Sequence, residues 1–132
     1  MSFHLLIQTP EREAYKGDAD ILTLSNDTGE MQVFPGHASM LGSITYSAVK
    51  VDHAQHEEAF VLRQGFVFVD QEKNEVKVLG LSCEKTADLD MVSAKEYLDF
   101  ILSKLDKPDE LNEYQLKFLE GQKLAVEKQL GS

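Results

Sequence analysis

The N-terminal part of the chain contains short stretches in which apolar and polar side chains alternate. At the start, Phe3, Leu5 and Ile7 alternate with the polar His4 and Gln8, and a period of two is typical of a half-buried β-strand. Further extended segments are expected at residues 13–16, 21–25, 31–34, 44–51, 58–63, 66–70 and 75–81. Short strands at regular spacing, with no long helix among them, favour an antiparallel β-sandwich over a parallel sheet.

Glycine marks the expected ends of several of these strands. Gly17-Asp18 is expected to stop the second strand, and Gly42-Ser43 is expected to separate two others. Gly65 is expected to open a new strand, because glycine in an apolar pattern often marks a turn or a bend.

The clearest alternation follows directly. Phe66 and Phe68 are expected on one face of a strand, and Val67 and Val69 on the other. A polar turn at residues 71–74 then leads into the next strand, so the two strands are expected to form a hairpin.

The pattern changes near the end of this part. Apolar residues in the range 89–105 recur at three- and four-residue steps, which predicts an amphipathic helix that Asp88 or Asp90 caps. Pro108 breaks this helix, because proline lacks the N–H that a continuing helix needs. A second apolar series covers residues 111–130, and two helices joined by so short a turn run antiparallel.

Two domains are therefore expected: an antiparallel β-sandwich over residues 1–85 and an antiparallel α-helical hairpin over residues 86–132. Gly121 lies inside the second helix and costs about 1 kcal/mol relative to alanine. It either weakens this helix or marks the close approach of another backbone.

Composition narrows the possible partners. Apolar residues make up 42% of the 132 residues, which is enough for a core. The net charge of -10 argues against nucleic acid and anionic lipid as partners. No apolar run approaches the roughly 20 residues that span a bilayer, so no direct membrane insertion is expected. Cys83 is the only cysteine, which excludes an internal disulfide and favours a reducing compartment.

The stretch TGEMQVFPGHASML at residues 28–41 carries the most information. Asn26, Asp27 and Gly29 before and within it predict a tight turn, since these residue types tolerate positive φ. Pro35-Gly36 predicts a second turn. A short strand is thus expected between two surface loops.

In residue order this stretch resembles the signature of the epsilon subunit of F-type ATP synthases. The matching residues are Gly29, Glu30, Met31, Val33, Pro35, Gly36, His37, Ala38 and Leu41. Supporting matches are Phe3-His4-Leu5, the run Gly65-Phe66-Val67-x-Val69, Val76-x-Val78-Leu79 and Asp88-Leu89-Asp90. The resemblance covers the whole chain and agrees with the expected sandwich and hairpin.

The resemblance implies a rotor subunit of the central stalk that does no chemistry itself. In this family the sandwich binds the gamma subunit and rests on the c-ring, so that ion flow through the ring drives ATP synthesis in the catalytic head. The hairpin lies on the sandwich, or extends along the stalk and inhibits ATP hydrolysis by contacting the head. The resemblance also implies a peripheral position at the cytoplasmic face of the cell membrane, as part of the ATP synthase. The first residues, MSFHLLIQTP, have no charged region followed by a long apolar segment, so neither a signal peptide nor a transit peptide is expected, which favours a bacterial or an organelle-encoded gene.

The resemblance also assigns contact residues. Gly29, Glu30 and Met31 match the part that touches the c-ring, where a carboxylate suits a ring loop that carries arginine. The residues that match the gamma-facing part are His37, Ala38, Ser39, Met40 and Leu41. The alternatives are a solvated turn carboxylate and a histidine that only satisfies backbone groups of its turn.

Some family members bind regulatory ATP where the first helix begins, through an aspartate and an arginine three residues later. Here Asp90 is present, but Ser93 occupies the arginine position. Without a guanidinium the phosphates lose a bidentate partner, so weak or absent ATP binding is expected. In the family, basic residues of the hairpin contact the catalytic head, but here acidic residues outnumber lysines from Asp88 onward. The alternative role of these lysines is a solvated helix face with ion pairs such as Glu113–Lys117.

The competing interpretation is a small cupin-like, metal-binding β-sandwich enzyme. His53 and His56 are the tempting ligands, but residues 52–57 are expected to form a polar turn. Residues three apart in a strand point to opposite faces, and a structural zinc site needs four suitable ligands. No catalytic residue, metal or cofactor is therefore expected, and Cys83 is expected to be a buried filler.

Overall fold

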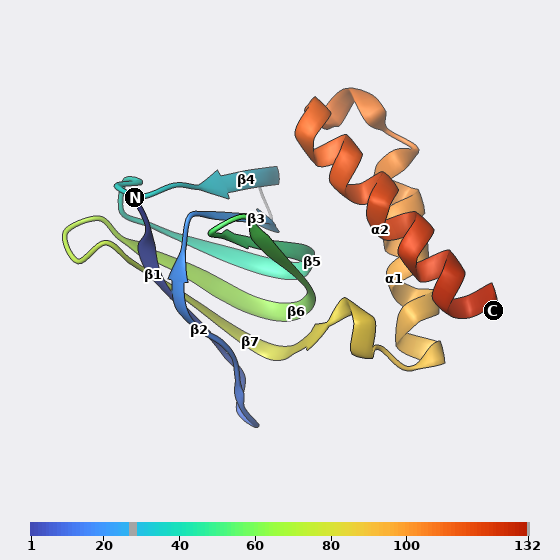
Figure 1. Cartoon of the computed structure of the whole chain (residues 1–132), viewed down its shortest axis with the longest axis horizontal. Helices are drawn as coiled ribbons and strands as arrows, with labels where there is room; N and C mark the ends of the chain where they lie inside the picture. The colour runs from blue at the N-terminus through green and yellow to red at the C-terminus, as the bar shows by residue number, and fades with distance from the viewer. Residues whose placement is uncertain (27–28, 132) are drawn as a thin grey trace. The chain divides into compact units, whose positions relative to one another are not determined.

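The computed structural model describes residues 1–26 and 29–131. The chain divides into two compact units, Met1–Lys85 and Thr86–Ser132 (Figure 1).

The first unit is one seven-stranded sheet with the order β2-β1-β7-β6-β5-β3-β4. Its strands are β1 (Phe3–Gln8), β2 (Glu13–Ala19), β3 (Ile21–Asn26), β4 (Gly29–Val33), β5 (Met40–His53), β6 (His56–Asp70) and β7 (Glu75–Lys85). Neighbouring strands are antiparallel except β1 and β7, which are parallel. The prediction of a β-sandwich followed by two helices is confirmed, with the addition that hydrogen bonds join all seven strands.

The sheet folds over and encloses its own core. Buried apolar side chains come from every strand, including Phe3, Leu5 and Ile7 of β1. Tyr15 of β2 meets the ring of Phe60 of β6 edge-on, with the ring centroids 6.5 Å apart. Because β1 and β7 separate these strands in the sheet order, this contact requires the sheet to close on itself.

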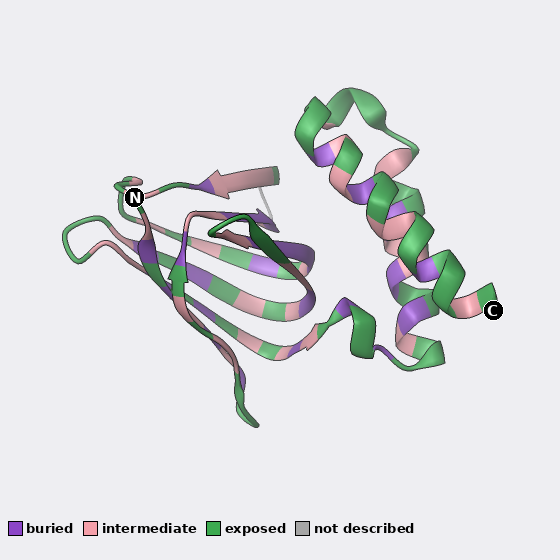
Figure 2. Ribbon diagram, in the orientation of Figure 1, coloured by how far each residue is buried: buried purple, intermediate pink, exposed green. Residues whose placement is uncertain are grey.

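The long strands form the corner of this sandwich by turning a different face inward along their length. In β6, Phe60 and Leu62 are buried, and then Val67 and Val69, so the inward positions change from even to odd numbers. Between them Gln64 has a φ of 47°, which re-aims the side chains that follow. Figure 2 shows the alternating bands of buried and exposed residues along these strands. Such bends let one strand belong to both layers of a sandwich.

Strand β7 makes the same change. Val76 and Val78 are buried, and then Cys83. Gly65 and Gly80 lie opposite each other where the two strands bend.

Three of the predicted strand ends are therefore wrong. Gly65 lies inside β6 (His56–Asp70), Gly42-Ser43 inside β5 (Met40–His53), and Gly17-Asp18 inside β2 (Glu13–Ala19). At Gly65 the glycine permits a bend and a close backbone approach without ending the strand.

The second unit holds two helices, α1 (Met91–Leu105) and α2 (Glu113–Gly131), with short 3₁₀ turns at Thr86–Asp88 and Pro108–Glu110. Of the two predicted capping residues, Asp88 and Asp90, it is Asp90 that caps α1. Its carboxylate accepts a hydrogen bond from the Ser93 amide at 2.8 Å.

The helices are antiparallel and are held together by a small buried seam. This seam consists of Ala94, Tyr97 and Ile101 of α1 and Gln115, Leu119 and Val126 of α2. The Tyr97 hydroxyl donates to the side chain of Gln122 at 3.0 Å, and the Gln129 amide donates to the Leu89 carbonyl at 3.0 Å. A Cβ at Gly121 would meet nothing within 4 Å, so no described residue outside its own stretch of helix makes a close approach on that side of the backbone.

Candidate subunit-contact surface

Glu30 lies within strand β4 and not in the loop predicted before it. It pairs with Ser25 of β3, whose hydroxyl donates to the Glu30 carboxylate at 2.5 Å. The Ser25 amide in turn donates to the Ser47 hydroxyl at 2.8 Å. The carboxylate is thus held in a defined position on an edge strand. The predicted turn residue Asp27 lies outside the described residues.

The neighbours of Glu30 differ in exposure. Gly29 is exposed at the start of β4, whereas Met31 is half-buried and packs against the core. Of the three predicted ring-contact residues, Gly29 is therefore exposed, whereas Glu30 and Met31 are both half-buried.

The second predicted contact segment begins at the expected Pro35-Gly36 turn. Gly36 has a φ of 80°, and the His37 amide donates to the Phe34 carbonyl at 3.1 Å. The His37 ring nitrogen Nδ1 lies 2.7 Å from the Ala38 carbonyl, so this histidine satisfies a backbone group of its own loop. Ala38 is exposed.

At the end of this segment the side chains divide between core and surface. Ser39 is exposed, Met40 begins β5 and packs against the core, and Leu41 is 63% exposed. Of these residues, Leu41 offers the largest free apolar side chain.

Leu41 belongs to a larger apolar surface, which we call the outer face. It pairs with Phe68 across β5 and β6, and Phe66 pairs with Leu79 across β6 and β7. The side chains of this face are Leu41, Phe66, Phe68, Leu79 and Leu81, exposed by 63, 50, 38, 41 and 64%. The rings of Phe66 and Phe68 are 6.4 Å apart. Contiguous exposed apolar side chains of this kind mark binding surfaces in monomeric proteins.

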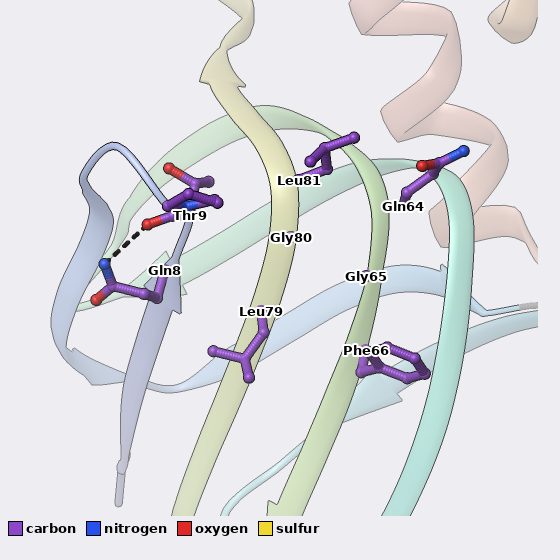
Figure 3. Close-up of a pocket in the computed structure, with 9 residues that line it drawn as sticks. Gln8, Thr9, Gln64, Gly65, Phe66, Leu79, Gly80 and Leu81 are labelled. Atoms are coloured by element: carbon purple, nitrogen blue, oxygen red, sulfur yellow. Dashed lines mark hydrogen bonds between the residues drawn. The ribbon is translucent and has the colours of Figure 1, made fainter.

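A groove of about 670 Å³ opens on the outer face at the corner of β6 and β7. Figure 3 shows Phe66, Leu79 and Leu81 around Gly65 and Gly80, which contribute no side chain. Gln8, Thr9, Pro10 and Gln64 complete the lining. The lining carries no charge, although the chain has a net charge of -10, so the groove suits apolar side chains.

Sequence reasoning placed Phe66 and Phe68 on one face of β6 but did not assign them to a contact. The available signal was that both faces of this strand are apolar, which is unusual when one face is solvated.

Asp90, the residue at the position where some family members bind nucleotide, caps helix α1. The Asp90 carboxylate accepts from the Ser93 amide, and the Asp90 carbonyl accepts from the Ala94 amide at 2.8 Å. Both groups stabilise the first turn of α1.

The polar turn predicted at residues 52–57 is a tight hairpin, in which His53 and His56 are direct partners across its two strands. The two histidines therefore lie on the same face of the sheet, whereas the prediction placed them on opposite faces. Only Ala54 and Gln55 lie between them, both with positive φ. His53 lies 3.3 Å from a carboxylate oxygen of Asp20, whose other oxygen accepts from the Ala54 amide at 2.8 Å. Among residues 1–26 and 29–131, no three histidine, cysteine or acidic side chains are arranged to hold a metal ion.

Cys83 is 2% exposed and belongs to the core. Burial raises the pKa of its thiol to about 12, although the guanidinium of Arg12 acts in the opposite direction. Arg12, which is distant in sequence, donates to the Cys83 carbonyl at 2.9 Å. The thiol is therefore protonated at neutral pH, which fits a filler and not a nucleophile.

Neither helix in the described part of the chain is long and apolar enough to cross a membrane.

Residues 2–86 match the family model described as ATP synthase, Delta/Epsilon chain, beta-sandwich domain. The ATP synthase epsilon chain of Synechococcus sp. (strain CC9311) is 31% identical over 98 residues, which cover 74% of this chain and 71% of that protein. The chloroplastic ATP synthase epsilon chain of Tetradesmus obliquus is 29% identical over 109 residues, covering 83% and 79%.

Solved structures share the fold. A chain of the Euglena gracilis mitochondrial ATP synthase aligns with a TM-score of 0.65 at 16% identity, covering 90% of this chain and 73% of that one. A chain of the Tetrahymena thermophila mitochondrial ATP synthase central stalk and c-ring aligns with a TM-score of 0.57 at 11% identity, covering 91% and 95%. Because the family model spans most of the chain and the Synechococcus relative is similar over most of its own length, the chain belongs to the ATP synthase delta/epsilon chain family and is a non-catalytic subunit of that enzyme.

Proposed function

We propose that this chain is a rotor subunit of the central stalk, which grips the gamma subunit and the c-ring and transmits rotation between ion flow and the catalytic head. The observation that carries the proposal is the outer face, which adjoins the segment expected to contact gamma. The Tetrahymena chain with a similar fold comes from a central stalk and c-ring assembly. Family membership decides against the cupin-like alternative.

The gamma subunit is the proposed partner of the outer face. Leu41 ends the contact segment 37–41, and Phe68 lies directly opposite it. Because these side chains are 38–64% exposed, each one that a partner covers contributes about half of the value for full burial, on the order of 1 kcal/mol. An apolar surface of gamma is the expected complement.

Mixing with the gamma subunit tests this proposal. The wild-type chain is expected to form a complex with gamma on size exclusion. The double variant Leu41→Asp, Phe68→Asp is expected to abolish this complex. Both positions are exposed in the free chain, but in the complex the two new charges would be buried without partners. Leu124→Asp, at a residue of α2 that is 68% exposed, is the matched control. Loss of binding in the control alone, or binding by the double variant, would contradict a contact through the outer face.

We further propose that Gly29, Glu30 and Met31 meet the c-ring. The hydrogen bond from Ser25 fixes the Glu30 carboxylate on an edge strand, where it is accessible to a cationic group on a ring loop. A carboxylate that already has one partner in place loses less side-chain entropy when it binds a second.

The hairpin is proposed to regulate ATP hydrolysis through the catalytic head. Its lysines, such as Lys117 and Lys123, lie on a compact unit that is separate from the sandwich. Ending the chain after Thr86 is expected to raise hydrolysis by the assembled enzyme. Unchanged hydrolysis would refute an inhibitory hairpin.

The same assembly sets the proposed location, which is peripheral at the cytoplasmic face of the cell membrane as part of the ATP synthase. Regulatory ATP is proposed to bind weakly or not at all, because Ser93 supplies no guanidinium and the Asp90 carboxylate already caps α1.

A further inference from the structure

The loop between β4 and β5, residues 34–39, is held by hydrogen bonds from the turn between β6 and β7. The Gly36 amide donates to the Asn74 side chain at 3.2 Å, and the Gln71 side chain donates to the Gly36 carbonyl at 3.0 Å. The Gln71 amide also donates to the Ser39 hydroxyl at 2.9 Å. Both polar backbone groups of Gly36 and the side chain of Ser39 are thus held by two residues of one turn.

Asn74 is itself fixed by its surroundings. Its φ of 52° lies in the left-handed region, which asparagine tolerates better than most residues. Its side chain donates to the Ser2 carbonyl at 2.8 Å, and its carbonyl accepts from the His4 amide at 3.0 Å. Asn74 therefore connects this loop to the start of β1 through hydrogen bonds.

These bonds matter because the loop has little packing of its own. Gly36, Ala38 and Ser39 are exposed, and a loop without buried side chains would sample many conformations. Fixing the backbone of each free residue costs about 1–2 kcal/mol, and this cost would fall on binding affinity if the loop were ordered only in the complex.

We propose that Gln71 and Asn74 are positioning residues that hold the segment 37–41 ready for the gamma subunit. The inference rests on the proposed function, because the partner of this segment is gamma. Neither residue needs to touch gamma; they act through the conformation of the Pro35-Gly36 turn.

Two variants remove the side chains and leave the turn intact. Asn74→Gly keeps the backbone free to adopt positive φ, and Gln71→Ala keeps the amide that donates to Ser39. Glu72→Ala is the matched control, since Glu72 is an exposed residue of the same turn. Hydrogen exchange of the Gly36 amide is measured in the free chain, together with gamma affinity and the exchange of the buried Leu62 and Val67 amides.

In Asn74→Gly, the Gly36 amide is expected to exchange faster, while the core amides exchange as in the wild type. Each of the two variants is expected to weaken gamma binding by about tenfold, which is the loss that one to two hydrogen bonds produce. Glu72→Ala is expected to match the wild type. Full gamma affinity in both variants would overturn the inference even if Gly36 exchanges faster. If the wild type itself fails to bind gamma, the proposed function fails instead, and the exchange data still report whether the loop is held.

Discussion

Gly65 and Gly80 lie directly opposite each other where β6 and β7 bend, and a Cβ built on Gly65 would overlap the carbonyl oxygen of Leu79. The obstacle is backbone and cannot rotate away. Gly65→Ala is therefore expected to destabilise the fold by about 3 kcal/mol, the upper part of the usual cost of overpacking. Urea unfolding measures this as a lower midpoint.

Gly121→Ala provides the opposite control. Nothing lies within 4 Å of a Cβ at this position in α2, so the substitution is expected to stabilise the helix by about 0.5–1 kcal/mol. A neutral Gly65→Ala would contradict the close approach at the corner.

The sequence predicted the strands well because alternation directly reflects which side chains are buried. Val67 and Val69 face the core and Phe66 and Phe68 face outward, so the two pairs lie on opposite faces of the strand, as their alternation predicted. Which of two apolar faces lies inside depends on the strands that cover it, and no local pattern contains that information. Glycine was misread as a strand end for the same reason, since a bend at Gly65 depends on its neighbour in β7.

The contact residues show the same limit. The turn at Pro35-Gly36 follows from local residue preferences, whereas the bonds from Gln71 and Asn74 join segments far apart in the chain. The face on which His53 and His56 lie could not be predicted either, because it is set by a hairpin with only two loop residues.

Cys83 makes stability depend on pH in the alkaline range. Its ordinary pKa of 9.0 rises to about 12 in the folded chain because of burial. Above pH 9 the unfolded thiol loses its proton while the folded one keeps it, so stability falls as pH rises, by up to about 1.4 kcal/mol per pH unit between pH 9 and 12.

Replacing the thiol isolates this effect. Urea unfolding of the wild type and Cys83→Ala at pH 7, 9 and 10.5 is expected to show a smaller alkaline loss in the variant, on top of a constant cost for the smaller side chain. Parallel pH profiles would show that Cys83 does not titrate differently on unfolding.

Glu30 is expected to matter for coupling and not for folding. Glu30→Gln retains an acceptor for the Ser25 hydroxyl but removes the charge, which weakens a charge-assisted contact with the ring by about 1.5–3 kcal/mol. ATP hydrolysis by the assembled enzyme is expected to persist while ATP-driven ion pumping falls, and Glu30→Ala is expected to lower it further. Glu11→Gln, at an exposed acid between β1 and β2, serves as the control. Normal pumping in both Glu30 variants would count against the ring contact.

The absence of an arginine at Ser93 is expected to keep the affinity for ATP low. The amide of Ser93 donates to the Asp90 carboxylate, and its short side chain has no guanidinium for a phosphate. Calorimetry is expected to detect no ATP binding in the micromolar range for the wild type. Ser93→Arg leaves the capping amide in place and supplies a bidentate phosphate partner, so it is expected to tighten binding about tenfold or more. Asp90→Asn, which still caps the helix, is expected to behave as the wild type. Micromolar affinity in the unaltered chain would show that phosphates are held by groups other than an arginine at this position.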